Sequence, residues 1–208
     1  MKKSKVKAVP ARALIKLDLG CGINKRQGFI GVDSRQFDGV DQVVNLAHHL
    51  SPPKLDLQGN VIAPGTFHPW PWENASVEEA HCSHFVEHLT GPERIHFVNE
   101  LYRVLIPGGK CQIVVPNWAS ARAYGDLTHQ WPPVCEFWFY YLSRKWREGN
   151  APHNDGYRCN FSVTWGYTLH TAIAARNQEY QSHAIGFWKE AAQDIVATLV
   201  KTPMETDV

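Results

Sequence analysis

The sequence has almost no net charge, because 21 Lys and Arg residues balance 20 Asp and Glu residues to give +1 at neutral pH. Without an excess of positive charge, no overall field attracts the chain to nucleic acid or to an anionic membrane. The sequence also has no apolar run approaching the length of a transmembrane helix, and no apolar N-terminal stretch typical of a signal peptide. We therefore expect no duplex DNA partner and no membrane association.

The cysteines also lack the regular spacing of a disulfide or zinc framework. The chain has five cysteines, an odd number, and no CxxC pair. Small disulfide-stabilised domains and structural zinc sites need regular cysteine spacing, so neither is expected here. Free thiols are typical of a reducing compartment, and we predict a cytoplasmic protein.

The length and composition favour a single folded unit. A chain of 208 residues that is 44% hydrophobic can bury the core of one α/β domain, which we assign to residues 13–208. Residues 1–12 carry five basic side chains without apolar periodicity. We predict a disordered tail there, and a basic arm that contacts phosphates is the alternative.

A glycine-bearing turn organises the first half of the chain. Residues 15–33 contain an apolar strand, a turn with Gly20 and Gly22, and a second strand that ends in Asp33. Glycine lets a ligand approach the backbone closely, and an acid at the tip of the next strand suits a ribose. The third glycine of the dinucleotide fingerprint is missing, which makes an NAD-linked oxidoreductase the weaker alternative. Asp18, just before the turn, suits a ligand with an ammonium group.

A polar segment follows the strand predicted at residues 77–82. Ser83 and His84 lie at its carboxyl end, the edge where open α/β sheets bind ligands. The same segment contains His84-x-x-Glu87-His88, the inverted zinc-protease pattern. On a helix, the two histidines would share a face and could bind zinc. The upstream glycine turn and the preceding strand do not fit that fold, so we predict no metal and keep the protease as an alternative.

These motifs together resemble the class I S-adenosylmethionine-dependent methyltransferases. Asp-Leu-Gly-Cys-Gly at 18–22 is similar to their first motif, and Gly-Val-Asp at 31–33 to the motif that follows. Ser-His-Phe-Val-Glu-His-Leu at 83–89, followed by Pro-Gly-Gly at 107–109, resembles the type 11 branch. The resemblance covers residues 14–117, about half of the chain.

The resemblance implies a Rossmann-like, doubly wound, mostly parallel sheet that binds S-adenosylmethionine. It places Asp33 on the ribose, the glycine turn under the methionyl group, and the end of the fourth strand beside the adenine and sulfonium. Lys25 would face the methionyl carboxylate, or alternatively solvent. The predicted cofactor-binding residues are Asp18, Gly20, Cys21, Gly22, Lys25, Asp33, Ser34, Ser83 and His84.

Residues 118–167 hold 13 of the 24 aromatic residues in the chain, and residues 134–147 are expected to form one aromatic helix. We predict an aromatic-rich lid on the acceptor side, which serves either to pack the core or to line an acceptor pocket. Gly125 to His129 resembles a Gly-Asp-Pro-Thr-His segment of type 11 relatives. His129 is the candidate general base, with Asp126 to orient it; a structural histidine is the alternative.

The end of the chain is predicted to differ from the class. Residues 160–167 alternate as a half-buried strand, and apolar residues at helical spacing predict a C-terminal helix over 171–200. With a single late strand, the closing strand hairpin of the class is not expected.

The predicted function is methyl transfer from S-adenosylmethionine to the oxygen or nitrogen of an unidentified small molecule or biopolymer. The sulfonium is already activated, so the protein has to position donor and acceptor and take up a proton. The alternative is a catalytically inactive S-adenosylmethionine-binding module, which is favoured if the lid seals the cofactor from any acceptor.

Overall fold

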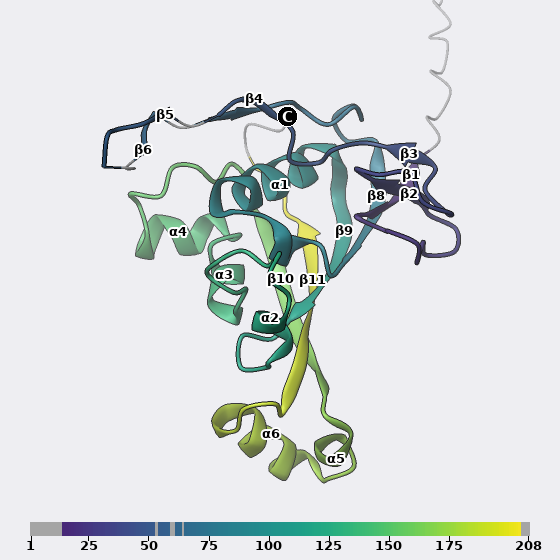
Figure 1. Ribbon diagram of the computed structural model, residues 1–208, viewed down its shortest axis with the longest axis vertical. Helices are drawn as coiled ribbons and strands as arrows, with labels where there is room; N and C mark the ends of the chain where they lie inside the picture. Colours follow the sequence, from purple (N-terminus) through teal and green to yellow (C-terminus); the bar gives the residue numbers. More distant parts are fainter. Residues whose placement is uncertain (1–13, 53, 59–60, 64, 205–208) are drawn as a thin grey trace, which may run out of the picture.

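The computed structural model describes residues 14–52, 54–58, 61–63 and 65–204, so the predicted tail at 1–12 lies outside the described residues. A seven-stranded sheet forms its centre, in the order β10-β11-β9-β8-β1-β2-β3 (Figure 1). Neighbouring strands from β3 to β9 are parallel, while β11 is antiparallel to both β9 and β10. This mostly parallel α/β sheet confirms the predicted fold class. The strands are β1 (Ile15–Leu19), β2 (Ile30–Asp33), β3 (Gln42–Val43), β8 (Val77–Ser83), β9 (Leu105–Pro116), β10 (Phe161–Leu169) and β11 (Ala192–Lys201).

The helix predicted over 171–200 is wrong in its second half. Two short helices, α5 (Thr171–Ala174) and α6 (Gln178–Phe187), are followed by strand β11, which completes the closing hairpin with β10. The β11 segment is rich in β-branched residues, and its completely buried side chains also fit a period of two: Ile195, Ala197 and Leu199. Pairing with β9 decided between the two periods, because β11 supplies partners for the backbone groups along that strand. In Figure 1, α5 and α6 lie beyond the end of the sheet.

Helix α1 (Gly91–Val104) connects β8 to β9, as the sequence predicted. Its start is fixed by a capping box between Thr90 and Glu93, with Pro92 in the first turn. The fully buried side chains Phe97, Val98 and Leu101 pack it into the core. The helix that links β8 to β9 is therefore held in place by core packing.

The segment between β3 and β8 folds into short strands, of which β4 and β7 contact α1. These are β4 (His49–Ser51), β5 (Lys54–Leu55), β6 (Val61–Ala63) and β7 (Thr66–Phe67), paired as β4 with β7 and β5 with β6. The Phe67 ring stacks on His96 of α1 at a centroid distance of 4.6 Å. The backbone N–H of Trp70 donates to Glu100, also on α1.

A polar row crosses β1, β8 and β9 on one face of the sheet. Lys16, Glu79 and Lys110 lie opposite one another in the strand register, and Lys16 binds Glu79 at 2.9 Å. This pairing explains why a central strand carries acidic residues.

The connection from β1 to β2, residues 20–29, contains no helix and is shorter than the dozen residues that parallel crossovers usually need.

Residues 118–167 form short pieces rather than one helix. They contain α2 (Arg122–Gly125), α3 (Glu136–Tyr140) and α4 (Arg144–Asn150), and Ser143 caps α4, which divides the helix predicted at 134–147. Phe139 is buried and stacks on Trp165 of β10. Part of the aromatic segment thus belongs to the core.

Among the described helices, none combines the length and apolarity needed to cross a membrane.

Candidate functional site

The glycine turn lies at the carboxyl end of β1 and is held by the tip of β2. The N–H groups of Gly20 and Cys21 both donate to the Val32 carbonyl. The Asp33 carboxylate accepts from the N–H of Gly22 at 3.0 Å and from the N–H of Arg35 at 3.1 Å. Each carboxylate oxygen has a second lone pair. Asp33 can thus support the turn and still accept hydrogen bonds from a ligand.

Asp18 holds the other side of the same turn. Its carboxylate is 2% exposed, accepts from the Arg26 N–H at 2.6 Å, and lies 2.8 Å from His81 Nδ1. The Arg26 guanidinium continues across the polar face of the sheet to Gln112. The direct ligand contact predicted for Asp18 stays a prediction, and in the structure this carboxylate positions the turn.

Two glycines give the turn its shape. Gly20 and Gly22 have φ values of +70° and +52°, in the left-handed region that other residues adopt at a cost. A Cβ on Gly20 would also lie 2.4 to 2.7 Å from atoms of the Phe85 side chain, whereas a Cβ on Gly22 would meet no atom within 4 Å. Phe85 therefore packs directly over the turn.

We expect Gly20→Ala to lower the free energy of unfolding by more than Gly22→Ala does. The second substitution adds backbone strain alone, about 1–2 kcal/mol, while the first adds a collision with Phe85. Chemical denaturation of both variants measures the difference. Equal losses would mean that Phe85 does not restrict this turn.

The remaining residues predicted near the turn are placed as follows. Cys21 is buried, and that burial raises the pKa of its thiol to about 11, so it stays neutral. Ser34 is exposed next to Asp33. The Lys25 ammonium pairs with Asp41 at 3.0 Å, and Asp41 also accepts from the Gly31 N–H. The contact of Lys25 with a ligand carboxylate stays a prediction, and in the structure its ammonium is paired with Asp41.

The end of β8 lies beside the turn, since Leu19 pairs with Cys82 in the register. Ser83 is the last strand residue, and His84 follows with a φ of +53°. The His84 imidazole lies 3.3 Å from Glu87 and 3.9 Å from Asp194, and the contact with Glu87 raises the pKa of His84. This imidazole is thus held between two buried carboxylates.

A short 3-10 helix, η1 (Val86–His88), is tied to the acceptor-side segment by Arg94 of α1. The Arg94 guanidinium is 5% exposed and donates to the backbone oxygens of Val86, Gln130 and Pro132. The Gln130 N–H also donates to the Glu87 carbonyl at 2.8 Å. These bonds bring His129 beside η1, although the two are about forty residues apart in sequence.

Glu87, His88 and His129 form a cluster there, which we call the Glu-His-His cluster. One candidate ligand atom of each residue lies within 4.8 Å of the others. The two imidazole rings meet edge to face at a centroid distance of 4.8 Å. Glu87 is 4% exposed, and its carboxylate accepts no hydrogen bond from any described residue.

Asp126 does not orient His129 as predicted. Its carboxylate accepts from the Thr128 N–H and hydroxyl at 2.8 and 2.7 Å, which lowers the pKa of Asp126. Thr128 in turn contacts His88 Nδ1 at 2.9 Å, while His129 Nδ1 contacts the Ala123 carbonyl. Asp126 thus acts on His88 through Thr128, and the Ala123 backbone orients His129.

Several residues of this region were missed by the sequence analysis. Arg94 lies on α1, Thr128 in the turn after α2, and Asp194 on the strand that was predicted as helix. Asp194 is buried and binds the Arg122 guanidinium at 2.9 Å. Alternation along β11 places Asp194 on the face opposite Ile195, Ala197 and Leu199, so no local pattern indicated its burial.

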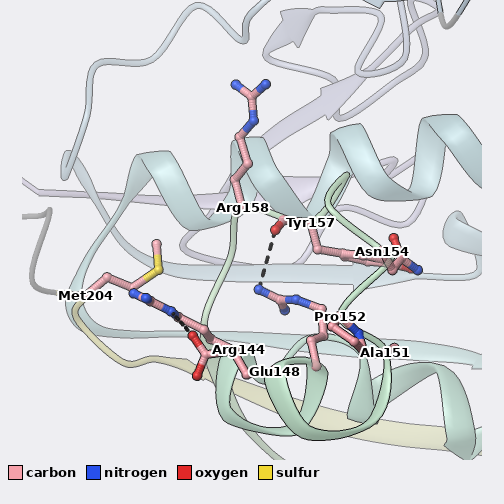
Figure 2. A pocket seen from close by; sticks show the side chains of 9 residues that line it. Arg144, Glu148, Ala151, Pro152, Asn154, Tyr157, Arg158 and Met204 are labelled. Carbon is pink, nitrogen blue, oxygen red and sulfur yellow. Dashed lines mark hydrogen bonds and ion pairs between the residues drawn. The ribbon is translucent and has the colours of Figure 1, made fainter.

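A cavity of about 430 Å³ lies elsewhere, between α4 and the C-terminal segment (Figure 2). Its lining includes Arg144, Arg147 and Tyr157, but Arg144 pairs with Glu148 and Arg147 donates to the Tyr157 and Cys159 carbonyls. In Figure 1, α4 and β2 lie on opposite sides of the view. We place the candidate site at the turn and the cluster, because the chemistry-bearing residues converge there.

Comparison with known proteins agrees with this placement. Residues 17–113 match the family model described as a methyltransferase domain. No curated protein sequence matches the chain. A solved S-adenosylmethionine-dependent methyltransferase from Archaeoglobus fulgidus is similar in fold, with a TM-score of 0.55 and 16% identity over 91% of this chain and 87% of that one. The 1,6-didemethyltoxoflavin-N1-methyltransferase of Burkholderia thailandensis has a TM-score of 0.50 and 14% identity, covering 92% of this chain and 72% of its own.

The matched residues include the glycine turn, Asp33, the end of β8 and η1, which are the features the sequence motifs had indicated. Residues 17–113 thus match a methyltransferase domain, and the chain has the fold of S-adenosylmethionine-dependent methyltransferases, in agreement with the family, enzyme class and cofactor predicted from the sequence.

Proposed function

We propose that this chain transfers the methyl group of S-adenosylmethionine to an oxygen or nitrogen of its acceptor, beside the Glu-His-His cluster. The observation that carries the proposal is a cluster of titratable groups at the carboxyl end of β8, next to the glycine turn. The acceptor lone pair forms a bond to the methyl carbon, and the pair of the carbon–sulfur bond stays on sulfur as a thioether. The acceptor proton is taken up at the cluster, where His129 is the predicted base.

The cofactor contacts that we propose follow from the turn. Asp33 accepts hydrogen bonds from the ribose hydroxyls, and Gly20 and Gly22 let the methionyl part pass close to the backbone. Ser83 and His84 lie at the strand end that neighbours the turn, where the adenine and sulfonium are proposed to bind. Asp18 contributes by fixing the turn from the side of β8.

An inactive binding module is the second candidate. It would require the aromatic segment to seal the cofactor. Instead, Trp118, Leu127 and Trp131 are 50, 97 and 79% exposed, so the segment presents apolar surface to solvent near the cluster. Exposed apolar side chains beside a polar cluster are typical of ligand-binding surfaces, which supports a catalytic role.

Turnover decides between these candidates. The protein is incubated with S-adenosylmethionine and a panel of phenol, carboxylic acid, amine, nucleoside and single-stranded RNA acceptors, and formation of S-adenosylhomocysteine is measured. Acceptor-dependent turnover is expected for at least one class. S-adenosylmethionine binding without turnover across the whole panel would favour the inactive module.

Duplex DNA is expected to bind weakly, because the net charge is +1 and affinity for duplex DNA depends strongly on contacts between Lys or Arg and phosphates. Fluorescence anisotropy with a random 20-base-pair duplex, measured at low and high salt, tests this. Tight binding that weakens steeply with salt would contradict it.

A further inference from the structure

We propose that Glu87, His88 and His129 form a binding site for a divalent first-row transition cation, such as Zn²⁺ or Mn²⁺. The proposal rests on the Glu87 carboxylate and the His88 and His129 imidazoles, which lie close together and do not hydrogen-bond to one another. It also explains how a half-buried surface next to the methyl donor could hold an acceptor oxygen. From the sequence we predicted no metal, because the glycine turn and the strand before His84 do not fit a zinc protease.

The hydrogen bonds around the cluster fix the neutral tautomer of both imidazoles. The Thr128 hydroxyl has one proton and donates it to Asp126, so it must accept from Nδ1–H of His88. The Ala123 carbonyl has no proton, so it must accept from Nδ1–H of His129. When neutral, each ring therefore carries its free lone pair on Nε2. Histidines that bind metals show this arrangement, with the other nitrogen donating to a carbonyl or a polar side chain.

The third group, Glu87, is a buried acid that is only partly paired. The Glu87 carboxylate is enclosed by protein, and neither oxygen accepts a hydrogen bond from the described residues. Its nearest cationic neighbour is His84, at an ion-pair distance of 3.3 Å and on the rim of the site. Burying a charge without full pairing is costly, and a bound cation removes that cost.

The spacing suits one ion after a small adjustment. The three candidate ligand atoms lie within 4.8 Å of one another, and ligands on one ion at bond lengths of about 2.1 Å are at most about 4.2 Å apart. His88 and His129 are only partly buried, so their rings have room to move inward. Two imidazoles and one carboxylate favour Zn²⁺, Mn²⁺ or Fe²⁺ over Mg²⁺ and Ca²⁺, which prefer oxygen ligands.

This inference extends the proposed function, because a cation at this position would bind an acceptor oxygen and lower its pKa. His129 would then act as a ligand through Nε2, and its proton-accepting role would pass to solvent. The cation site itself is defined by binding, so its test does not depend on a known acceptor.

Calorimetric titration of chelator-treated protein with MnCl₂ and with ZnCl₂ tests the site, with MgCl₂ as the comparison. One equivalent of Mn²⁺ or Zn²⁺ is expected, bound more tightly than Mg²⁺. Glu87→Gln and His88→Ala should weaken this binding by about 100-fold or more, and Thr128→Val, which frees the His88 ring, by about 10- to 100-fold. His183→Ala, on an exposed face of α6, is the matched control and should bind like the wild type.

The same samples are titrated with S-adenosylhomocysteine, which separates the two proposals. Retained cofactor binding shows that His88→Ala and Thr128→Val are folded. The cation site is overturned if the wild type binds neither ion saturably, or if the Glu87 and His88 variants bind as tightly as the wild type. Cation binding without any cofactor binding would instead contradict the proposed function and leave the cation site standing.

Discussion

His129→Ala is expected to lower methyl transfer by about 10²- to 10⁴-fold while the affinity for S-adenosylmethionine stays unchanged. Because Nδ1 of His129 donates to the Ala123 carbonyl, the neutral ring carries its free lone pair on Nε2. Removing the ring removes the proton acceptor or, if the cluster is loaded with a cation, one of its ligands. Neither role touches the glycine turn, so cofactor binding is preserved.

Steady-state turnover of His129→Ala measures the loss of rate, and calorimetry measures its affinity for S-adenosylmethionine. His183→Ala serves again as the control, since it removes an exposed imidazole from α6. The cation titration then distinguishes the two roles of Nε2, because a pure base role leaves cation binding unaffected. If the variant retains near-wild-type turnover with an O–H or N–H acceptor, His129 has no part in the reaction.

Asp33→Ala is expected to weaken S-adenosylmethionine binding by about 1.5–3 kcal/mol, because the ribose hydroxyls lose a charged hydrogen-bond acceptor. This range corresponds to about a 10- to 150-fold increase in Kd. The substitution also removes the acceptor of the Gly22 N–H. Part of the loss therefore comes from a less ordered turn.

Asp33→Asn separates these contributions. Asparagine keeps one oxygen that can accept from the Gly22 N–H but removes the charge that favours the ribose hydroxyls. We expect Asp33→Asn to unfold like the wild type and to bind S-adenosylmethionine with intermediate affinity. Equal affinities for the wild type and Asp33→Ala, measured by calorimetry, would remove Asp33 from the cofactor site.

The parts of the fold that the sequence predicted are those with local causes. The glycine turn needs positive φ at Gly20 and Gly22, and only glycine adopts such φ values without strain. The capping box of Thr90 and Glu93 determines where α1 begins, and the parallel strands coincide with apolar runs that have the length of a strand. The position of Ser83 and His84 at the ligand edge followed from strand order alone.

The parts that were missed depend on contacts between distant segments. Strand β11 carries both a helical and an alternating pattern, and pairing with β9 decided between them. The ion pair between Lys25 and Asp41, 16 residues later, was not predicted. The Glu-His-His cluster forms because Arg94 binds the backbone of the acceptor-side segment, and no local pattern encodes that contact.

Calorimetric titration of the unmodified protein with S-adenosylhomocysteine and, separately, with NAD tests the central claim most directly. The glycine turn with Asp33, and without the third glycine of a diphosphate loop, predicts saturable binding of one S-adenosylhomocysteine and no measurable binding of NAD. Saturable binding of NAD without binding of S-adenosylhomocysteine would contradict it.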